Sequence, residues 1–497
     1  MKRCILILMI CSLSLSCDSL LSPTPQGQIA LDDLLSTENG IITAVNGAYQ
    51  PLQNIYKGNM FPILELASDD GWIWRKEVEP DIFIIEETHG GVQSIWSEHY
   101  VGITRTNTVL DRIGKVEGFS SEAQKNNLIG QAKFLRAFYY FNLVRIFGGV
   151  PLILQEIVVR EDSERPRASI KEVYDQVKLD LTEAISLLPI KQGGGRGSQP
   201  GMATNLSARA LLTLVNLELE EWDQVVSNSA LLLTNGSLLN AYADNFNGTQ
   251  ENGPHVFFEV QYGGVAANTT SGISNTLAPP DFAGTAVIMP TDENLQGKGG
   301  SLSSGNGFMQ ALEPNDQRKS TLVQSYNLPN FIEPSKPNGS LFYVNKYYNT
   351  KDLRGLSTWN FPLIRYAEIL LARAEALIEI NAGLGGEALE LLNKTRVNAG
   401  LAPLSLNDLP DQTSFRNALR KERRVELAFE MKRYFDLNRW GILEEVIQKQ
   451  MDFLGLNFPN QRITNHPITG KSYFLYPIPS IEFVNNANLG VQNDGYN

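Results

Sequence analysis

The sequence predicts a mainly α-helical protein in which tetratricopeptide-like helical repeats support a loop-rich subdomain with short strands. Two observations predict this fold class. Apolar residues recur at three- and four-residue spacing in both halves of the 497-residue chain, as they do in amphipathic helices. Between these halves, residues 240–358 are rich in glycine, asparagine, serine, threonine and proline, and only short runs such as HVFFEVQYG and SLFYVNKYY have strand character.

The first residues have the pattern of an exported lipoprotein. Two basic residues precede the apolar run CILILMICSLSL, which has the length of a signal-peptide core. A serine stands directly before Cys17, an order similar to a bacterial lipobox, in which the cysteine becomes lipidated. We therefore expect residues 1–16 to be a lipoprotein signal peptide, Cys17 to be the lipidation site, and residues 17–36 to be a lipidated tether. A plain secretory peptide is the alternative.

Composition excludes several classes of function. The three cysteines, Cys4, Cys11 and Cys17, all lie in this leader, so the rest of the chain has no thiol for a disulfide, a metal site or catalysis. Past the leader, no apolar run approaches the roughly 18–20 residues that a membrane span needs. The formal net charge of −12 repels phosphate backbones, so we expect no nucleic acid partner.

The N-terminal helical part, residues 37–239, contains several periodic segments. Helices are predicted over residues 38–56, 92–114, 122–148 and 169–189. The last of these starts with a capping-box pattern, Ser169 and Glu172. Residues 203–235 predict a helical hairpin with Trp222 at the start of its second helix, close to the length of a tetratricopeptide repeat.

The C-terminal helical part, residues 359–451, repeats this arrangement. Residues 361–380 and 385–400 form a second predicted helix pair, and a further helix is expected over about 410–440. The tail, residues 452–497, is irregular and rich in turn-forming residues.

One stretch of this part, KERRVELAFEMKRYFDLNRWG at 421–441, resembles an active site. Its carboxylates Glu422, Glu426 and Glu430 repeat every four residues. Glycoside hydrolysis needs two carboxylates that face each other across a sugar, so a stripe on one helix favours ion pairing instead. The pairs expected at i+3 or i+4 are Arg423–Glu426, Glu430–Arg433 and Lys432–Asp436. The neighbouring aromatic residues suggest a partly buried ionic network that fixes how helices dock.

Several segments resemble signatures of the SusD/RagB family of bacterial outer-membrane nutrient-binding lipoproteins. They are KFLRAFYYFNLVRIFGGVPLI (133–153), PLIRYAEILLARAEAL (362–377), the stretch at 421–441, and YPIPSIEFVNNANLGVQNDGY (476–496). The matches occur in family order along the chain.

The resemblance implies four tetratricopeptide-like helix pairs with a loop-rich region packed against them, as one compact unit over residues 37–497. It also implies a cell-surface lipoprotein, held in the outer membrane by its lipid anchor, that binds an oligosaccharide without catalysis. Such a protein delivers its ligand to a SusC-like TonB-dependent transporter. A peptide-binding member of the family and a helical-repeat scaffold that binds only proteins are the alternatives.

Enzyme motifs are missing from the sequence. The four histidines are scattered without the spacing of a metal site, and GGGRG at 193–197 lacks the Lys-Ser/Thr of a phosphate loop. We therefore expect no catalytic residues, no metal and no cofactor.

The best sugar-binding candidates lie in the segment DDGWIWR. Trp72 and Trp74 point to the same side of an extended segment, and Asp70 and Arg75 flank them. In the resembling family, the loop between the first two helices contributes to the ligand site. Further candidates are the aromatic residues in or beside the loop-rich region, with packing inside that region as the alternative: Tyr262, Tyr326, Tyr343 and Trp359.

Overall fold

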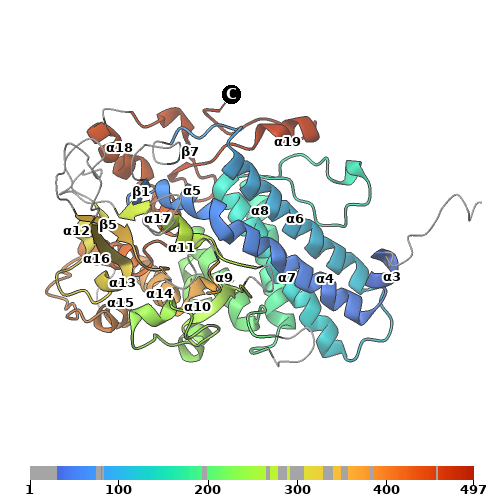
Figure 1. Ribbon diagram of the computed structural model, residues 1–497, viewed down its shortest axis with the longest axis horizontal. Coiled ribbons are helices and arrows are strands. Elements are labelled where there is room, and N and C mark those ends of the chain that lie inside the picture. Colours follow the sequence, from blue (N-terminus) through green and yellow to red (C-terminus); the bar gives the residue numbers. More distant parts are fainter. Residues whose placement is uncertain are drawn as a thin grey trace, which may run out of the picture.

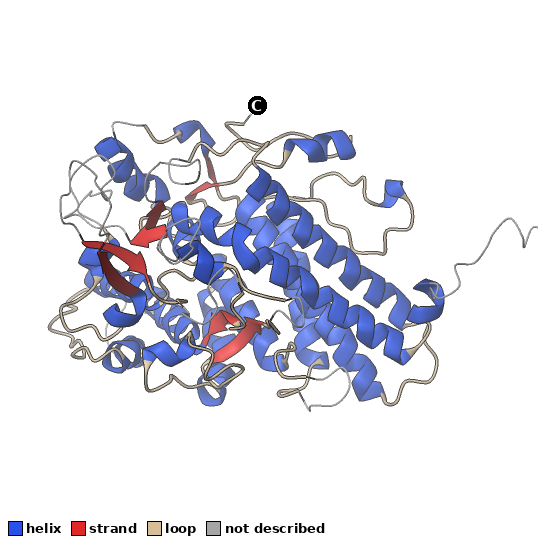
Figure 2. Cartoon of the chain, in the orientation of Figure 1, coloured by secondary structure: helices blue, strands red, loops and turns tan. Residues whose placement is uncertain are grey.

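The computed structural model describes residues 31–73, 80, 83–192, 199–264, 269–277, 288–290, 307–327, 340–348, 356–380, 386–454 and 457–496. The predicted signal peptide and Cys17 lie outside these residues. Within them the chain is mainly helical with a few short strands, which confirms the fold class (Figure 2). No helix in the described ranges is long and apolar enough to cross a membrane.

Long helices from the N-terminal part pack side by side (Figure 1). They are α4 (Glu38–Asn54), α6 (Gly90–Ile113), α7 (Glu122–Phe147) and α8 (Ile170–Leu187). Helix α8 begins with the predicted capping box, since Ser169 accepts from the backbone N–H of Glu172 and the Glu172 carboxylate accepts from the N–H of Ser169. The four predicted helices are therefore confirmed to within two residues at each end.

The folded body begins earlier than the predicted end of the tether. Helix α3 spans Leu31–Leu35, inside the segment expected to be unstructured. Leu35 is buried, and Asp32 forms an ion pair with Arg112 of α6 at 2.6 Å. The tether prediction is therefore wrong for these residues, because one turn of helix with a single buried leucine is too short for periodicity to reveal.

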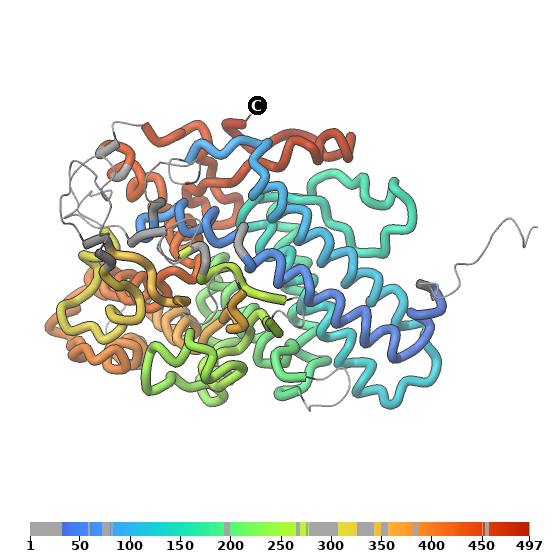
Figure 3. The backbone as a smooth tube through the Cα atoms, in the orientation of Figure 1, coloured from blue at the N-terminus to red at the C-terminus, as the bar shows by residue number. Residues whose placement is uncertain are grey.

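The helical series continues through both halves of the chain. Helices α9 (Asn205–Glu218) and α10 (Trp222–Asn235) form the predicted hairpin, and Trp222 opens the second helix as expected. Helix α10 packs against α14 (Tyr366–Ile380), which packs in turn against α15 (Glu387–Asn398) and α16 (Gln412–Glu426). Segments more than a hundred residues apart thus form one continuous layer of helices, as the tube in Figure 3 shows.

The prediction of a helix from residue 361 is wrong for its first turn. Residues Phe361–Arg365 form strand β6, which pairs antiparallel with β2 (Val256–Val260), and helix α14 starts only at Tyr366. All five β6 residues are buried. A short, fully apolar run is compatible with either a buried helix or a buried strand, so periodicity does not distinguish them.

The single helix predicted over about 410–440 is also wrong. Helix α16 ends at Glu426 and a separate helix, α17, spans Arg433–Arg439. Between them the backbone turns through positive φ angles at Phe429 (59°) and Met431 (60°). None of the three local ion pairs expected in the stretch forms, because the charged side chains pair with other partners, most of them from other parts of the chain.

Short elements lie in the segment after α4 and in the loop-rich part. They are η1 (Ile55–Asn59), α5 (Met60–Leu66), β1 (Gly71–Ile73), η3 (Tyr242–Asn245), α11 (Ile273–Leu277), β3 (Ile288–Pro290), α12 (Phe308–Ala311), α13 (Lys319–Leu322), β4 (Val323–Asn327) and β5 (Ser340–Val344). One further short element, η2 (Arg160–Asp162), lies between α7 and α8. The chain after α17 adds α18 (Leu443–Leu454), η6 (Asn460–Arg462), β7 (Ile463–Asn465), β8 (Ser472–Phe474) and α19 (Ser480–Asn485).

A buried ion network joins the loop-rich part to the helices. It consists of Arg318, Lys346, Arg365, Glu422, Glu426 and Glu430, each at most 4% exposed. Arg318 reaches Glu422 at 2.7 Å and Glu426 at 3.0 Å. Arg365 of β6 reaches Glu426 at 2.9 Å and Glu430 at 2.6 Å, and Lys346 lies 2.6 Å from Glu430. The hypothesis of an ionic network is confirmed, with partners distant in sequence instead of local.

A further buried carboxylate lies beside this network. Glu65 of α5 accepts a hydrogen bond from the backbone N–H of Met431, and its second oxygen has no partner among the described residues. Burial raises the pKa of Glu65 to about 8, and the negative charge of Asp70 adds to the shift. Burial thus favours the protonated form of Glu65 in the folded protein. By contrast, burial is outweighed at Glu430, where Arg365 and Lys346 hold the pKa at about 2.

We expect Glu430→Ala to lower the free energy of unfolding by about 3–5 kcal/mol, because it leaves Lys346 buried without its carboxylate and removes one of the two carboxylates that pair with Arg365. Urea denaturation measures this loss. Glu445→Ala is the matched control, since its exposed pair with Lys449 should contribute less than about 0.5 kcal/mol. Equal effects of the two substitutions would contradict the structural importance of the network.

Glu65 should also make stability depend on pH. Its folded pKa of about 8 exceeds the unfolded value of 4.5, so the unfolded chain binds fewer protons between these limits. Stability from this group is therefore greatest below about pH 4.5 and falls by about 1.4 kcal/mol per unit as pH rises toward 8. Denaturation at pH 5.5 and 7.5 should show a smaller decline for Glu65→Gln than for the parent; parallel declines would show that Glu65 is already ionised.

Candidate ligand-binding site

Strand pairing brings the tryptophan segment to the loop-rich part. Strand β1 pairs antiparallel with β3, with Trp72 opposite Met289. Strand β3 lies against β5, which pairs antiparallel with β4 (Figure 1). These four strands are referred to below as the strand surface. Chain segments more than two hundred residues apart thus meet beside the segment singled out in the sequence.

Two of the candidate tyrosines belong to the β4–β5 hairpin. Gln324 is opposite Tyr343 and Tyr326 is opposite Leu341. Tyr343 is itself 9% exposed and packs edge-on against Tyr348, with ring centroids 5.8 Å apart. Of the other candidates, the side chains of Trp72 and Tyr326, and all of Trp74 and Arg75, lie outside what the structure describes.

Asp70 has a different position from the one expected. Its carboxylate is fully buried and accepts from Arg424 Nε at 2.6 Å. The neighbouring Asp69 accepts from Arg433 Nε at 2.6 Å. Burial would raise the pKa of Asp69, but Arg424 and Arg433 outweigh it and hold the pKa at about 2. These aspartates clamp the turn before β1 onto α16 and α17, and Asp70 presents no surface to solvent.

Tyr262 and Trp359 lie beside β2 instead of on the strand surface. Tyr262 is buried, and its hydroxyl donates to the backbone oxygen of Gln53 at 3.2 Å. It therefore attaches the loop after β2 to helix α4. Trp359 is half-buried and packs against Gly248, where any side chain would overlap its ring. Packing, the alternative considered for these aromatics, accounts for the contacts of Tyr262.

Sequence reasoning missed a polar cluster at the end of β2. This amide cluster consists of Asn252, Gln261 and Asn360 around the carboxylate of Glu259. Asn360 Nδ2 donates to Glu259 Oε1 at 2.8 Å and to Gln261 Oε1 at 2.9 Å. Asn252 and Gln261 exchange two side-chain hydrogen bonds of 3.0 and 3.1 Å. The alternation in FFEVQY could have indicated that Glu259 and Gln261 share a face, but not that Asn252 and Asn360 join them.

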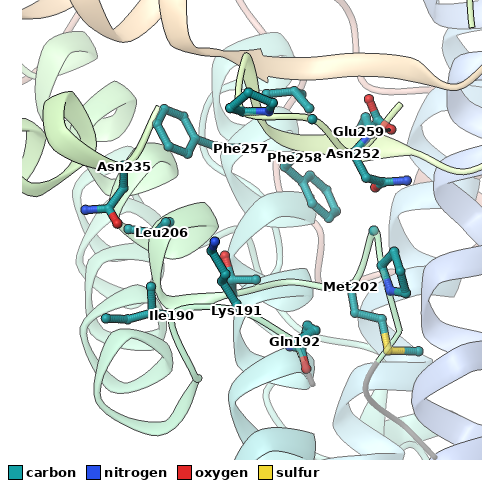
Figure 4. Close-up of a pocket in the computed structure, with 16 residues that line it drawn as sticks. Ile190, Lys191, Gln192, Met202, Leu206, Asn235, Asn252, Phe257, Phe258 and Glu259 are labelled. Carbon is teal, nitrogen blue, oxygen red and sulfur yellow. Dashed lines mark hydrogen bonds between the residues drawn. The ribbon is translucent and has the colours of Figure 1, made fainter. Parts of the chain in front are cut away.

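The amide cluster borders the pocket shown in Figure 4, which has a volume of about 420 Å³. Figure 4 shows Asn252 and Glu259 together on one side of the pocket, Asn235 on the other, and Lys191 between them. A second hollow of about 350 Å³ lies across residues 199–202 and shares Glu259 as a lining residue.

In the described ranges, the carboxylates singled out in the sequence are placed for ion pairing. There, no group of three or more His, Cys, Asp or Glu side chains is placed to hold a metal ion. Glu422, Glu426 and Glu430, the carboxylates that resembled an active site, are each bound to buried arginine or lysine side chains.

Comparisons with known proteins agree with this fold. A family model described as "SusD family" matches residues 301–496, and one described as "Starch-binding associating with outer membrane" matches residues 35–198. The chain is 27% identical to SusD-like protein P2 of Formosa agariphila, over 96% of each chain. It is also 27% identical to SusD-like protein P38 of the same organism, over 87% of this chain and 90% of that one.

Solved structures share the architecture. A SusD superfamily protein from Bacteroides vulgatus superposes with a TM-score of 0.77 at 21% identity, covering 93% of this chain and all of the other. A laminarin-binding SusD-like protein superposes with a TM-score of 0.70 at 24% identity, with the same coverage. The two family models, the relatives aligned along most of their length and the common fold show that this chain belongs to the SusD/RagB family.

Proposed function

We propose that this protein binds an oligosaccharide at the outer membrane without cleaving it and delivers it to a SusC-like TonB-dependent transporter. One observation carries the location of binding: the β1–β3 pairing places the Trp72 segment beside the tyrosine-bearing β4–β5 hairpin. Aromatic rings on loops can cover the apolar C–H face of a pyranose, whereas aromatics inside helices serve the core.

The family context supports a glycan as the ligand. One matching family model is described as starch-binding, and one structural neighbour is a laminarin-binding SusD-like protein. Another neighbour is surface glycan-binding protein A from Bacteroides fluxus. These names give a ligand class for the proposal and leave the linkage and chain length to the loops of this protein.

Binding and release are the whole of the proposed mechanism. The Asp69–Arg433 and Asp70–Arg424 pairs hold the turn before β1 in place before any ligand arrives. Preorganisation of this kind lowers the entropy lost when a ligand is captured. The captured sugar is held by ring stacking and hydrogen bonds, and the transporter then takes it over.

Membrane attachment completes the proposal. Lipidation of Cys17 would hold the protein at the outer membrane, where two or three acyl chains give a stable anchor. The residues between Cys17 and helix α3 serve as the tether, so the folded body stays close to the membrane and its transporter.

Trp72→Ala and Trp74→Ala should each weaken oligosaccharide binding at least about ten-fold, since burial of a large ring is worth on the order of 1.5–3 kcal/mol. Titration calorimetry against laminari-, malto- and xylo-oligosaccharides measures the change, and Trp222→Ala on α10 is the control for loss of a tryptophan elsewhere. Unchanged affinity in both variants would move the site away from β1. Binding of peptides but of no glycan would favour the peptide-binding alternative.

The purified protein should release no reducing ends from any oligosaccharide that it binds, because its clustered carboxylates are committed to ion pairs. A reducing-sugar assay over a day at 37 °C tests this. Glycan hydrolysis that persists through a second, orthogonal purification step would overturn the non-catalytic assignment.

A further inference from the structure

The pocket of Figure 4 and the hollow beside it form a groove on another part of the fold. They share the lining residues Pro200, Gly201, Met202 and Glu259, so they lie on either side of one short loop. Their volumes of about 420 and 350 Å³ fall within the roughly 300–1,000 Å³ of small-molecule sites. None of the four strands of the strand surface contributes a lining residue to either hollow.

The most distinctive group in this groove is the carboxylate of Glu259. The residue is only 5% exposed, yet it lines both hollows. Its Oε1 accepts from the backbone N–H of Asn252 at 2.8 Å and from Asn360 Nδ2 at 2.8 Å. Its Oε2 has no hydrogen-bond partner among the residues that the structure describes. This oxygen is not among the buried atoms without a partner, so it keeps contact with solvent in the groove and can accept a hydrogen bond from water or from a ligand.

The surrounding side chains keep this carboxylate in place. Gln261 exchanges hydrogen bonds with Asn252 and also accepts from Asn360, so the amide cluster is closed on itself. Gly201, with φ of +85°, lets the loop between the hollows lie directly against Gln261. These contacts therefore fix the orientation of the Glu259 carboxylate at the groove.

An apolar wall completes the pocket. The half-buried ring of Phe257 lines it together with Leu206 and Ile190. The pocket thus combines one fixed carboxylate acceptor, amide side chains and an apolar ring.

This combination selects among ligand classes. An anion could pair with Lys191 of the same pocket but would be repelled by the Glu259 carboxylate, and a wholly apolar ligand would displace water from Oε2 without supplying a donor. A divalent cation prefers several carboxylate ligands, and the described residues provide no such group here. A neutral sugar offers both hydroxyl donors and an apolar C–H face.

We propose that this groove is a second saccharide site, in which Glu259 Oε2 accepts a hydrogen bond from a hydroxyl of a neutral sugar unit and Phe257 covers its C–H face. The inference rests on the proposed function for its ligand class and is independent of the strand surface for its location. With two sites, one long glycan chain can stay bound at one while it exchanges at the other.

Two variants test the groove by different means. Glu259→Gln keeps the shape of the side chain but replaces the charged acceptor, and it should weaken binding at this site at least about ten-fold, as loss of a charge-assisted hydrogen bond does. Asn235→Trp places a large ring at the exposed end of α10 on the pocket rim, leaves the amide cluster intact and should block the site. Glu117→Gln, at an exposed position outside the groove, is the control.

The number of bound sugars decides between the outcomes. Native mass spectrometry with laminarihexaose, maltohexaose and xylohexaose should show two bound copies of at least one probe on the parent and on Glu117→Gln, and one copy on Asn235→Trp and Glu259→Gln. Hydrogen exchange should show that the probe protects residues 252–261 in the parent and not in Asn235→Trp.

The failures of the two proposals are distinguishable. One bound copy that is lost in Trp72→Ala and unaffected in both groove variants would overturn the second site and leave the proposed function intact. Two copies that persist in both groove variants would likewise overturn it. Absence of binding by any probe to the parent would count against both proposals.

Discussion

The fold depends on the cost of burying charge. Arg318, Lys346 and Arg365 are almost completely enclosed, and an isolated ion in such a place would cost several kcal/mol. Each is paired with glutamates of α16 or of the turn that follows it, and Arg318 pairs with its neighbour Asp316 as well. The loop-rich part, strand β6 and the C-terminal helices therefore have one arrangement in which all these charges are paired. Hydrophobic packing alone tolerates many alternatives, whereas a half-paired network is strongly unfavourable.

The same segment also positions the proposed ligand surface. Arg424 and Arg433 stand beside the network glutamates in sequence, but they point to Asp70 and Asp69. The turn at Met431 donates its backbone N–H to Glu65, on the helix that leads to these aspartates. Residues 421–441 thus bind the loop-rich part from one side and the entry to β1 from the other. A stretch that resembles an active site in the sequence thus holds in place the loops of the proposed ligand surface.

Sequence reasoning recovered the long helices because apolar residues recur along them at helical spacing, and some of them begin with a clear cap, as α8 does at Ser169. Sequence reasoning failed where tertiary contacts determine the secondary structure or the ion-pair partner. Strand β6 is an apolar run, and only its pairing with β2 distinguishes it from a helix. The break after Glu426 depends on positive φ angles at Phe429 and Met431, which their residue types do not predict. Local ion pairs were expected because only neighbours are visible in a sequence. The actual partners of Glu430 lie 84 and 65 residues away.

One candidate site could be found from the sequence, and the other could be found only from the structure. Paired tryptophans are conspicuous, so the DDGWIWR segment could be selected from the sequence, although the burial of Asp70 could not. The groove at Glu259 could not be selected at all, since its asparagines resemble ordinary loop residues and meet only in three dimensions. Its chemistry comes from a carboxylate that is held in place yet only half satisfied. For the proposed capture and release of a sugar, such a site has a physical advantage: the framework is already ordered, so binding needs only a few hydrogen bonds and release breaks only those.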